Sequence, residues 1–291
     1  MNLILEGVFS LWFLLVALSL IFTVYDIKHM PISWVQKLGW VLVILYSGPI
    51  GLFFYLLTCR SPGKGLHDVY TQAHWKQSVN SEVHCLAGDA TGIILAAIIL
   101  SFIDIANGTE LIVEYLSAFI FGWFIFQAGM MVNMYKSYGE AVKKTFFAET
   151  VSMNFVMIGM IPTMIILMSY IEHGRDPKHM AFWFIMGVAT IIGGIIAYPI
   201  NSWLVKNKLK HGCMTIPETT DVKHEHKKAM SEHSCGAKHQ HGGHGEHKHD
   251  EHQHHDMQTL PLKKSVSIVI GTFVLLAIAV IITIQFVPIN V

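Results

Sequence analysis

The sequence contains few charged residues. Of its 291 residues, 14% are Asp, Glu, Lys or Arg and 53% are hydrophobic, whereas about 25% of a typical soluble domain is charged. The charges balance to a formal net charge of zero, so the chain lacks the basic excess of nucleic-acid-binding proteins. The composition excludes an ordinary soluble domain. It predicts a membrane protein that contacts the lipid bilayer and has no nucleic-acid partner.

Cysteine is scarce as well, with residues only at 59, 85, 213 and 235. Four cysteines spread over a chain of this size do not suggest the disulfide framework of a small secreted domain. The first residues lack the basic region and cleavage site of a signal peptide, so we expect the apolar stretch there to remain as a membrane span. A nucleotide-binding P-loop and a phosphorylation-type Asp-Lys-Thr-Gly motif are also missing, so the sequence offers no ATP-driven transport motif.

Long uncharged stretches fill most of the sequence. A helix needs about 20 apolar residues to cross a bilayer, and seven stretches qualify: 7–25, 38–57, 86–105, 111–134, 150–171, 180–203 and 266–288. Backbone groups in lipid must form hydrogen bonds within their own segment, so these stretches are predicted to be helices. The expected fold is an all-α integral membrane protein of about seven transmembrane helices, the second kinked at Ser47–Gly51.

This pattern divides the chain into three parts. Residues 1–210 are predicted to form a six-helix membrane domain, and residues 263–291 a C-terminal transmembrane helix. Between them, residues 211–262 are rich in His, Gly, Lys and Glu. Such a segment cannot bury enough apolar surface to offset the loss of chain entropy, so we expect a disordered, His-rich loop.

Lysine and arginine are distributed unevenly between the loops. With seven spans, the loops after the second, fourth and sixth spans lie on one side and carry 11 nearby basic residues, against four on the other side. Cytoplasmic loops of membrane proteins carry the excess of Lys and Arg. We therefore expect the N-terminus and the His-rich loop to be cytoplasmic and the C-terminus to be external. All four cysteines then lie near the cytoplasmic face, where thiols stay reduced.

Histidine is concentrated in the loop, with 12 of the 18 residues between His211 and His255. Neutral imidazole binds copper, zinc and nickel, and pairs such as His224-x-His226 supply two ligands from a short segment. We predict a transition-metal site, with copper first and zinc or nickel as alternatives. A hydrated spacer, or a segment that charges in acid, is the competing interpretation. The predicted ligands are His224, His226, His239, His241, His244, His247, His249, His252, His254 and His255.

Methionines recur along the fifth predicted span. Steps of four, three, four and four residues keep them on one helical face, and their thioethers are soft ligands that favour Cu(I). Packing in an apolar core is the more common use of methionine, so the stripe has two interpretations, a metal path and simple packing. Its members are Met153, Met157, Met160, Met164 and Met168.

The third span opens with His84-Cys85, followed by Asp89. Ionisable groups within a span are costly and indicate function, and the three residues together could form a metal entry site. Alternatively, Asp89 forms a hydrogen bond with a polar residue such as Asn133 or Asn154. Gly88 and Gly92 are predicted to let another helix approach closely. We expect three other acidic residues to lie at helix ends in capping or solvated positions: Asp26, Asp104 and Glu149.

Three segments together resemble a bacterial integral membrane family known only as a domain of unknown function. They are HCLAGDATG at 84–92, AETVSMNFVMIGMIPTM at 148–164 and AYPINSWLVKNKLKHGCM at 197–214. The resemblance covers about half of the chain, from the third to the sixth span. It implies a bacterial inner-membrane protein and, through an association with copper-oxidase-type domains, favours copper. It implies no reaction, and the His-rich tract looks like an insertion particular to this chain.

The third of these segments ends in a compact set of nitrogen and sulfur donors, His211, Cys213 and Met214. They form a further candidate metal site, with anchoring at the membrane surface as the alternative. We expect the lysines that precede this set to lie among the lipid headgroups: Lys206, Lys208 and Lys210.

Three functions compete. The first is a metal-handling membrane protein that transports or buffers copper. The second is an accessory or assembly subunit, partnered by a copper enzyme or a metallochaperone. The third is a membrane oxidoreductase, although no histidine lies deep in a span where paired haem ligands would be needed. We therefore expect a protein without catalytic residues of its own.

Overall fold

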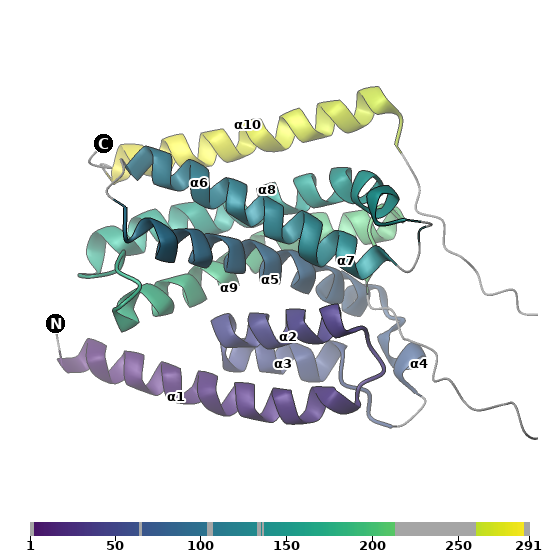
Figure 1. The fold of residues 1–291 in the computed structure, drawn as a ribbon, viewed down its shortest axis with the longest axis horizontal. Helices are drawn as coiled ribbons and strands as arrows, with labels where there is room; N and C mark the ends of the chain where they lie inside the picture. The colour runs from purple at the N-terminus through teal and green to yellow at the C-terminus, as the bar shows by residue number, and fades with distance from the viewer. Residues whose placement is uncertain are drawn as a thin grey trace, which may run out of the picture.

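The computed structural model describes residues 3–63, 66–103, 107–132, 135, 137–212 and 260–287, and within them the chain is helical (Figure 1). The helices, in chain order, are α1 (Leu3–Asp26), η1 (Ile27–His29), α2 (Trp34–Ser47), α3 (Pro49–Thr58), α4 (His67–Thr71), α5 (His74–Leu100), α6 (Asn107–Ile120), η2 (Phe121–Gln127), α7 (Ala128–Met131), α8 (Tyr138–Tyr170), α9 (Met180–Lys206) and α10 (Leu262–Phe286).

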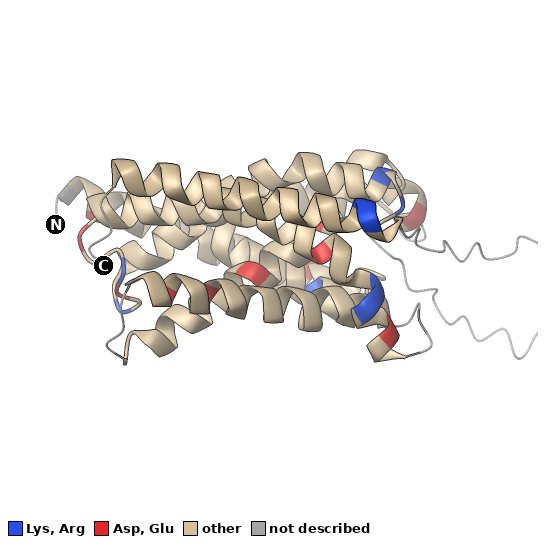
Figure 2. Cartoon of the chain, turned by 90° about the horizontal axis from the view of Figure 1, so that it is seen from above, with Lys and Arg blue, Asp and Glu red and all other residues tan. Residues whose placement is uncertain are grey.

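Six helical spans among the described residues are long and apolar enough to cross a membrane. They are Ile4–His29, His74–Leu100, Gly108–Met131, Tyr138–Tyr170, Met180–Lys206 and Leu262–Phe286. Lys and Arg gather at the ends of the helices, and a few acidic residues lie between the ends (Figure 2). The predicted all-α membrane fold is therefore confirmed.

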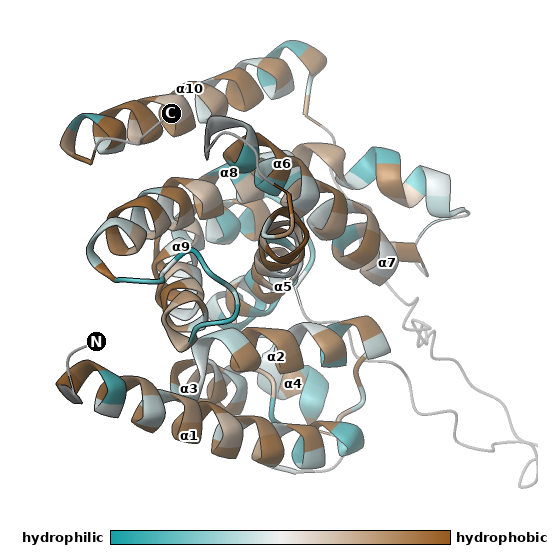
Figure 3. Cartoon of the chain, turned by 60° about the vertical axis from the view of Figure 1, so that its left-hand side comes forward, coloured by the Kyte–Doolittle hydropathy of each residue, from teal (hydrophilic) through white to brown (hydrophobic). Residues whose placement is uncertain are grey.

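α5 is the central helix of the bundle, and α1 and α10 lie at its edges. Most of α5 is buried against other helices, whereas α1 and α10 expose many large apolar side chains. These outer helices are coloured as hydrophobic over much of their length (Figure 3). In water such surfaces would drive aggregation, but they are suited to contact with lipid tails.

The second predicted span is two short helices rather than one. The chain breaks at Gly48–Pro49, inside the predicted kink, and α2 and α3 run side by side as a hairpin (Figure 1). Asn80 of α5 holds both open ends: its Oδ1 accepts from Gln36 Nε2 (3.2 Å), and its Nδ2 donates to the carbonyl of Thr58 (3.0 Å). The tip lies beside Val16, in the middle of α1. The hairpin therefore reaches only part of the way along the bundle.

This hairpin changes the expected sidedness. Because the chain returns to the end from which it came, the N-terminal end of α1 and the C-terminal end of α10 lie at the same end of the bundle (Figure 1). The seven-span prediction placed them on opposite sides. It also separated Lys28 from Arg60, yet Arg60 Nε lies 3.0 Å from Asp26 Oδ1 at the end of α1. Asp26 does lie at a helix end, where it pairs with Arg60 and accepts from the Tyr55 hydroxyl.

The tip of the hairpin depends on a glycine. Gly48 has a φ of +58° and a ψ of −130°, a conformation that side chains disfavour. A Cβ at this position would also stand 2.8 Å from Val16 Cγ2. Gly48 thus permits both the reversal of the chain and the approach of the tip to α1.

We expect Gly48→Ala to lower the melting temperature of the detergent-solubilised protein, with a cost of about 1–3 kcal/mol from the strained backbone and the contact with Val16. Gly7→Ala is the control, because Gly7 lies in α1 with nothing within 4 Å of its added Cβ. Equal melting temperatures for the two variants would contradict the assigned role of Gly48.

Candidate functional site

A buried lysine lies between α5, α8 and α9, just after the end of α9. The side chain of Lys210 is within the protein, with 1% of its surface exposed. Its Nζ donates to Cys85 Sγ on α5 at 2.7 Å, to Ser152 Oγ on α8 at 3.1 Å and to Asn201 Oδ1 on α9 at 2.8 Å. Three acceptors from three helices match the three protons of an ammonium group.

The chain after α9 folds back to place this lysine. The amide of Leu209 donates to the carbonyl of Leu204 (2.9 Å), and Lys208 takes a positive φ of 56°. Leu209 packs in a small apolar cluster with Leu204 and Val151. Gly212 lies so close to Gln77 that a Cβ would collide with it. The predicted headgroup position is therefore wrong for Lys210, although Lys206 and Lys208 are exposed.

The thiol of Cys85 links this lysine to a carboxyl group. Cys85 Sγ donates to Glu149 Oε2 at 3.0 Å while it accepts from Lys210. The Ser152 hydroxyl lies 3.2 Å from the same sulfur and 2.8 Å from Asn201 Oδ1, and its proton serves one of them at a time. Burial alone would lower the pKa of Lys210, but nearby Cys85 and Glu149 raise it above its usual value. This direction and the three acceptors around Nζ both favour the charged ammonium form.

Asp89 and Glu149 face each other across Gly122. Glu149 Oε1 and Asp89 Oδ1 lie 2.6 and 2.7 Å from the position that a Cβ of Gly122 would take. Both oxygens of Asp89 and Oε1 of Glu149 are buried without a hydrogen-bond partner among the described residues. The single ammonium of Lys210 cannot neutralise the carboxylates of both Asp89 and Glu149. The net charge of the cluster is zero only if one carboxyl group is protonated or a second cation binds.

Two predictions about these carboxyl groups are corrected. Glu149 does not lie at a helix end, because α8 begins at Tyr138 and Glu149 is fully buried in its interior. Asn154, the predicted partner of Asp89, instead accepts from the Tyr115 hydroxyl (2.7 Å) and donates to Thr272 (2.9 Å). The other suggested partner, Asn133, lies outside the described residues.

Small residues bring α5 and the following span together. A Cβ at Gly88 would meet the backbone of Gly122, and one at Gly92 would stand 2.6 Å from Ala118 Cα. The predicted close approach of a helix at Gly88 and Gly92 is therefore confirmed. Gly122 lies in η2, a π-helical segment. Such segments are rare, and they are frequently found at functional sites.

His84 is not brought together with its sequence neighbours. It is fully buried, and its Nδ1 lies 3.7 Å from the position of a Cβ on Gly39 of α2. Cys85 contacts α8, and Asp89 faces Gly122 of η2. Neither ring nitrogen of His84 has a hydrogen-bond partner in the described part of the chain. The predicted entry site thus separates into His84 on one face and Cys85 with Asp89 on another.

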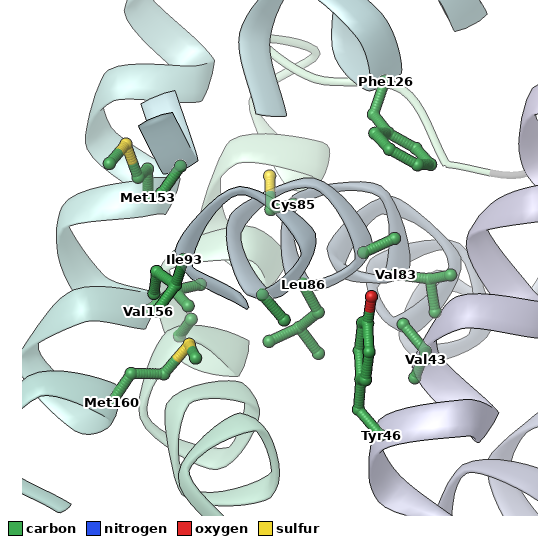
Figure 4. Packing of buried hydrophobic residues seen from close by; sticks show 14 of the residues in the cluster. Val43, Tyr46, Val83, Cys85, Leu86, Ile93, Phe126, Met153, Val156 and Met160 are labelled. Atoms are coloured by element: carbon green, nitrogen blue, oxygen red, sulfur yellow. The ribbon is translucent and has the colours of Figure 1, made fainter. Parts of the chain in front are cut away.

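The methionine stripe points into the protein. Met153, Met157 and Met160 are fully buried and Met164 is 4% exposed, whereas Met168 is only partly buried. Figure 4 shows Met153 and Met160 on the side of α8 near Ile93. The row thus contacts protein rather than lipid, as both the packing and the metal-path interpretations require.

The two ends of this row have polar neighbours. Met153 is four residues, about one helical turn, from Glu149. At the other end, Met164 and Met168 line a small cavity of about 50 Å³ together with Glu110, Glu114 and Arg175. Within the described residues, no group of three or more His, Cys, Asp or Glu side chains has the geometry of a preformed metal site.

Most of the predicted His-rich site lies outside the described part of the chain. His211 is described and half-buried. The other predicted ligands of this region lie outside the described residues: Cys213, Met214, His224, His226, His239, His241, His244, His247, His249, His252, His254 and His255.

Residues 74–210 match a family described as "Domain of unknown function (DUF4396)". The predicted resemblance to an uncharacterised family is therefore confirmed over this part of the chain. The match runs from the start of α5 to Lys210. It includes all six residues of the buried cluster described above, which are Cys85, Asp89, Glu149, Ser152, Asn201 and Lys210. No curated protein and no solved structure matches the chain. The association with copper-oxidase-type domains stays an expectation.

Sequence patterns did not identify Lys210, Glu149, Ser152 and Asn201 as members of one site. A signal was present, because the segment resembling the family contains Asn201 and Lys210 nine residues apart. Hydropathy assigned this lysine to the membrane surface, since positive residues after a span usually lie there. Only the return of the chain after α9 reveals that it is buried.

We expect Lys210→Met to destabilise the solubilised protein by about 3–5 kcal/mol, because it leaves buried acceptors and carboxyl groups without their cation. Lys206→Met is the control, since Lys206 is exposed near the same end of α9. Thermal unfolding followed by size-exclusion chromatography measures both. A Lys210→Met protein as stable as the control would contradict the charged role of this lysine.

Proposed function

We propose that this chain is a membrane metal-handling protein that transports or buffers a soft transition-metal ion, with copper first and zinc or nickel as alternatives. The observation that carries the proposal is the junction between a buried thiol with two carboxyl groups and a continuous row of buried thioethers. Cys85 and Glu149 form one end of the row, and Met153, Met157 and Met160 continue it along α8.

The buried centre offers a cation what it needs. Both oxygens of Asp89 and Oε1 of Glu149 lack hydrogen-bond partners among the described residues, and Cys85 supplies a soft donor. A thiol binds a metal as thiolate, so its proton must leave. Glu149 Oε2, already accepting from the thiol at 3.0 Å, is the group placed to take that proton.

Lys210 stabilises the buried cluster when no metal ion is bound at Cys85. Its ammonium lies among Cys85, Ser152 and Asn201, where it occupies the side of the thiol that an incoming cation would approach. Binding of a metal ion at Cys85 would displace the Lys210 ammonium. Departure of the metal ion would let the ammonium return to Cys85. This exchange agrees with the lack of a preformed metal cluster among the described residues.

A stepwise path follows from the thioethers. Steps of three and four residues along α8 place successive methionines about 4.5–6 Å apart along the helix axis. Weak, repeated ligands allow an ion to leave each site as well as enter it. Beyond Met164, the carboxyl groups of Glu110 and Glu114 line the small cavity at the opposite end.

We further propose that the protein resides in a bacterial plasma membrane, with the end of the bundle at which α9 ends and α10 begins facing the cytoplasm. Arg60, Lys76 and Lys143 belong to helices or loops at that end of the bundle, and the short hairpin adds Lys28 and Lys37 to it. Cytoplasmic ends carry this excess of basic residues. The N-terminal end of α1 and the C-terminal end of α10 would then both be external. This orientation presents the histidines to ions inside the cell.

Deletion of residues 224–255 tests the collecting role of the His-rich segment. It removes 11 of the 18 histidines, so we expect bound copper per purified protein to fall by more than about half. Elemental analysis after growth in copper measures the effect, with a Gly/Ser linker of equal length as the control for spacing. Unchanged copper content would contradict metal binding by this segment, and loss of membrane insertion would contradict its assignment as a loop.

The double variant Met157→Leu, Met160→Leu tests the thioether path. The change nearly conserves volume, so it should cost less than about 1.5 kcal/mol of stability, while copper movement in proteoliposomes should fall severalfold. Met186→Leu is the control, because Met186 is equally buried but lies on α9 outside the row. If the double variant transports copper as the wild type does, the methionines serve packing alone.

A further inference from the structure

A second cavity lies between the hairpin, α5 and α9. Its volume is about 390 Å³, and its lining is mostly aliphatic and aromatic. Pockets that bind small molecules have volumes of about 300–1,000 Å³ and mostly apolar walls with a few polar groups. The cavity exists because α2 and α3 are short, so that they cover α5 and α9 incompletely.

Glu82 is the charged side chain in this lining. Only 5% of its surface is exposed, and its Oε1 is buried without a hydrogen-bond partner among the described residues. Lys210 attracts Glu82 electrostatically but donates no hydrogen bond to it, because its three hydrogen bonds go to Cys85, Ser152 and Asn201. A buried carboxyl oxygen without a partner is costly, and a ligand that donates to it or carries a positive charge would remove the cost.

Other polar groups of the lining are already engaged. The Ser47 hydroxyl donates to the carbonyl of Val43, and the Thr190 hydroxyl donates to the carbonyl of Met186 at 2.8 Å. The indole Nε1 of Trp40 donates to Asn80 Oδ1 at 3.3 Å. Among the buried side-chain atoms of these walls that the structure describes, Glu82 Oε1, an acceptor, is therefore the one left without a hydrogen-bond partner.

Aromatic rings complete the walls. Trp40 and Phe54 come from the hairpin, and Tyr198 comes from α9. The faces of aromatic rings attract cations, most strongly where water is excluded. A carboxyl group together with several aromatic rings distinguishes a cation with an apolar body from a neutral lipid tail.

The cavity opens beside residues that face the outside of the bundle. Ile195, Trp75 and Phe54 line it and are 69%, 42% and 40% exposed. They lie on membrane-spanning helices and on the hairpin, so a ligand dissolved in the bilayer can reach the cavity from the side. This route suits a molecule that is both lipophilic and charged.

We propose that this cavity binds a lipophilic organic cation, with its positive group at Glu82 and its apolar body against Trp40, Phe54 and Tyr198. The site is separate from the row of thioethers on α8. The inference does not rest on the proposed metal function, and metal content and organic-cation binding are measured independently on the same protein samples.

Binding of methyltriphenylphosphonium to the full chain in lipid nanodiscs tests the proposal, with empty nanodiscs as the baseline. Triphenylphosphine oxide is the matched probe, since it has the same rings and no net charge. We expect saturable binding of the phosphonium with at least about tenfold preference over the oxide, because one charge contact in a dry site exceeds 1.4 kcal/mol. This comparison requires no variant. Equal affinity for the two probes, or no saturable binding, would overturn the proposal.

Two variants locate the site. Glu82→Gln should weaken phosphonium binding at least about tenfold and leave binding of the oxide unchanged, whereas Glu6→Gln, on the exposed part of α1, should change neither. Val79→Phe, which fills the cavity, should weaken both probes. If Glu82→Gln weakens both equally, or if Val79→Phe weakens neither, the cavity is an apolar slot for lipid or the probe binds elsewhere, and the proposal fails.

Discussion

The structure depends on how a single ammonium group is held inside a bundle of apolar helices. Burying an unpaired charge costs many kcal/mol, so every part of the chain around Lys210 must offset that cost. Three helices supply one acceptor each, and the segment after α9 must fold inward to deliver the lysine. The fit of Gly212 against Gln77 fixes that fold-back. The match to the family ends at Lys210 itself, so the lysine and its three acceptors all lie within the part of the chain that matches the family.

The two carboxyl groups that accompany the buried lysine constrain the packing of the helices. Asp89 and Glu149 need room on the side of η2, and Gly122 provides that room because any Cβ would collide with both. The same glycine receives the backbone of α5 at Gly88. A polar centre and a close helix contact thus share one residue. The span is π-helical at this point, a rare geometry that is frequently found at functional sites.

The sequence predicted the membrane fold well and the buried centre poorly, for physical reasons. Hydropathy detects long apolar helices, and it marked the break at Ser47–Gly51 because Gly and Pro interrupt a helix. It could not distinguish a kinked span from a hairpin, since a break between two apolar helical stretches is compatible with both. The spacing of Gly88 and Gly92 predicted close packing because small residues act locally on one face. The cluster around Lys210 joins residues up to 125 positions apart, and no local pattern encodes such a meeting. Glu149 was misplaced because α8 begins well before its apolar part.

The hairpin relates the remaining features to each other. A full second span would have covered α5 and α9, closed the cavity beside Glu82 and sent the chain to the other side of the membrane. By returning at mid-depth, α2 and α3 leave an apolar space next to one carboxyl group and keep the basic residues of both their ends at one end of the bundle. The interior then holds two kinds of acidic site. The carboxyl groups at Gly122 share an ammonium with a thiol, whereas Glu82 faces a cavity with aromatic walls. We propose soft inorganic ions for the first set of donors and a cation with an apolar body for the second.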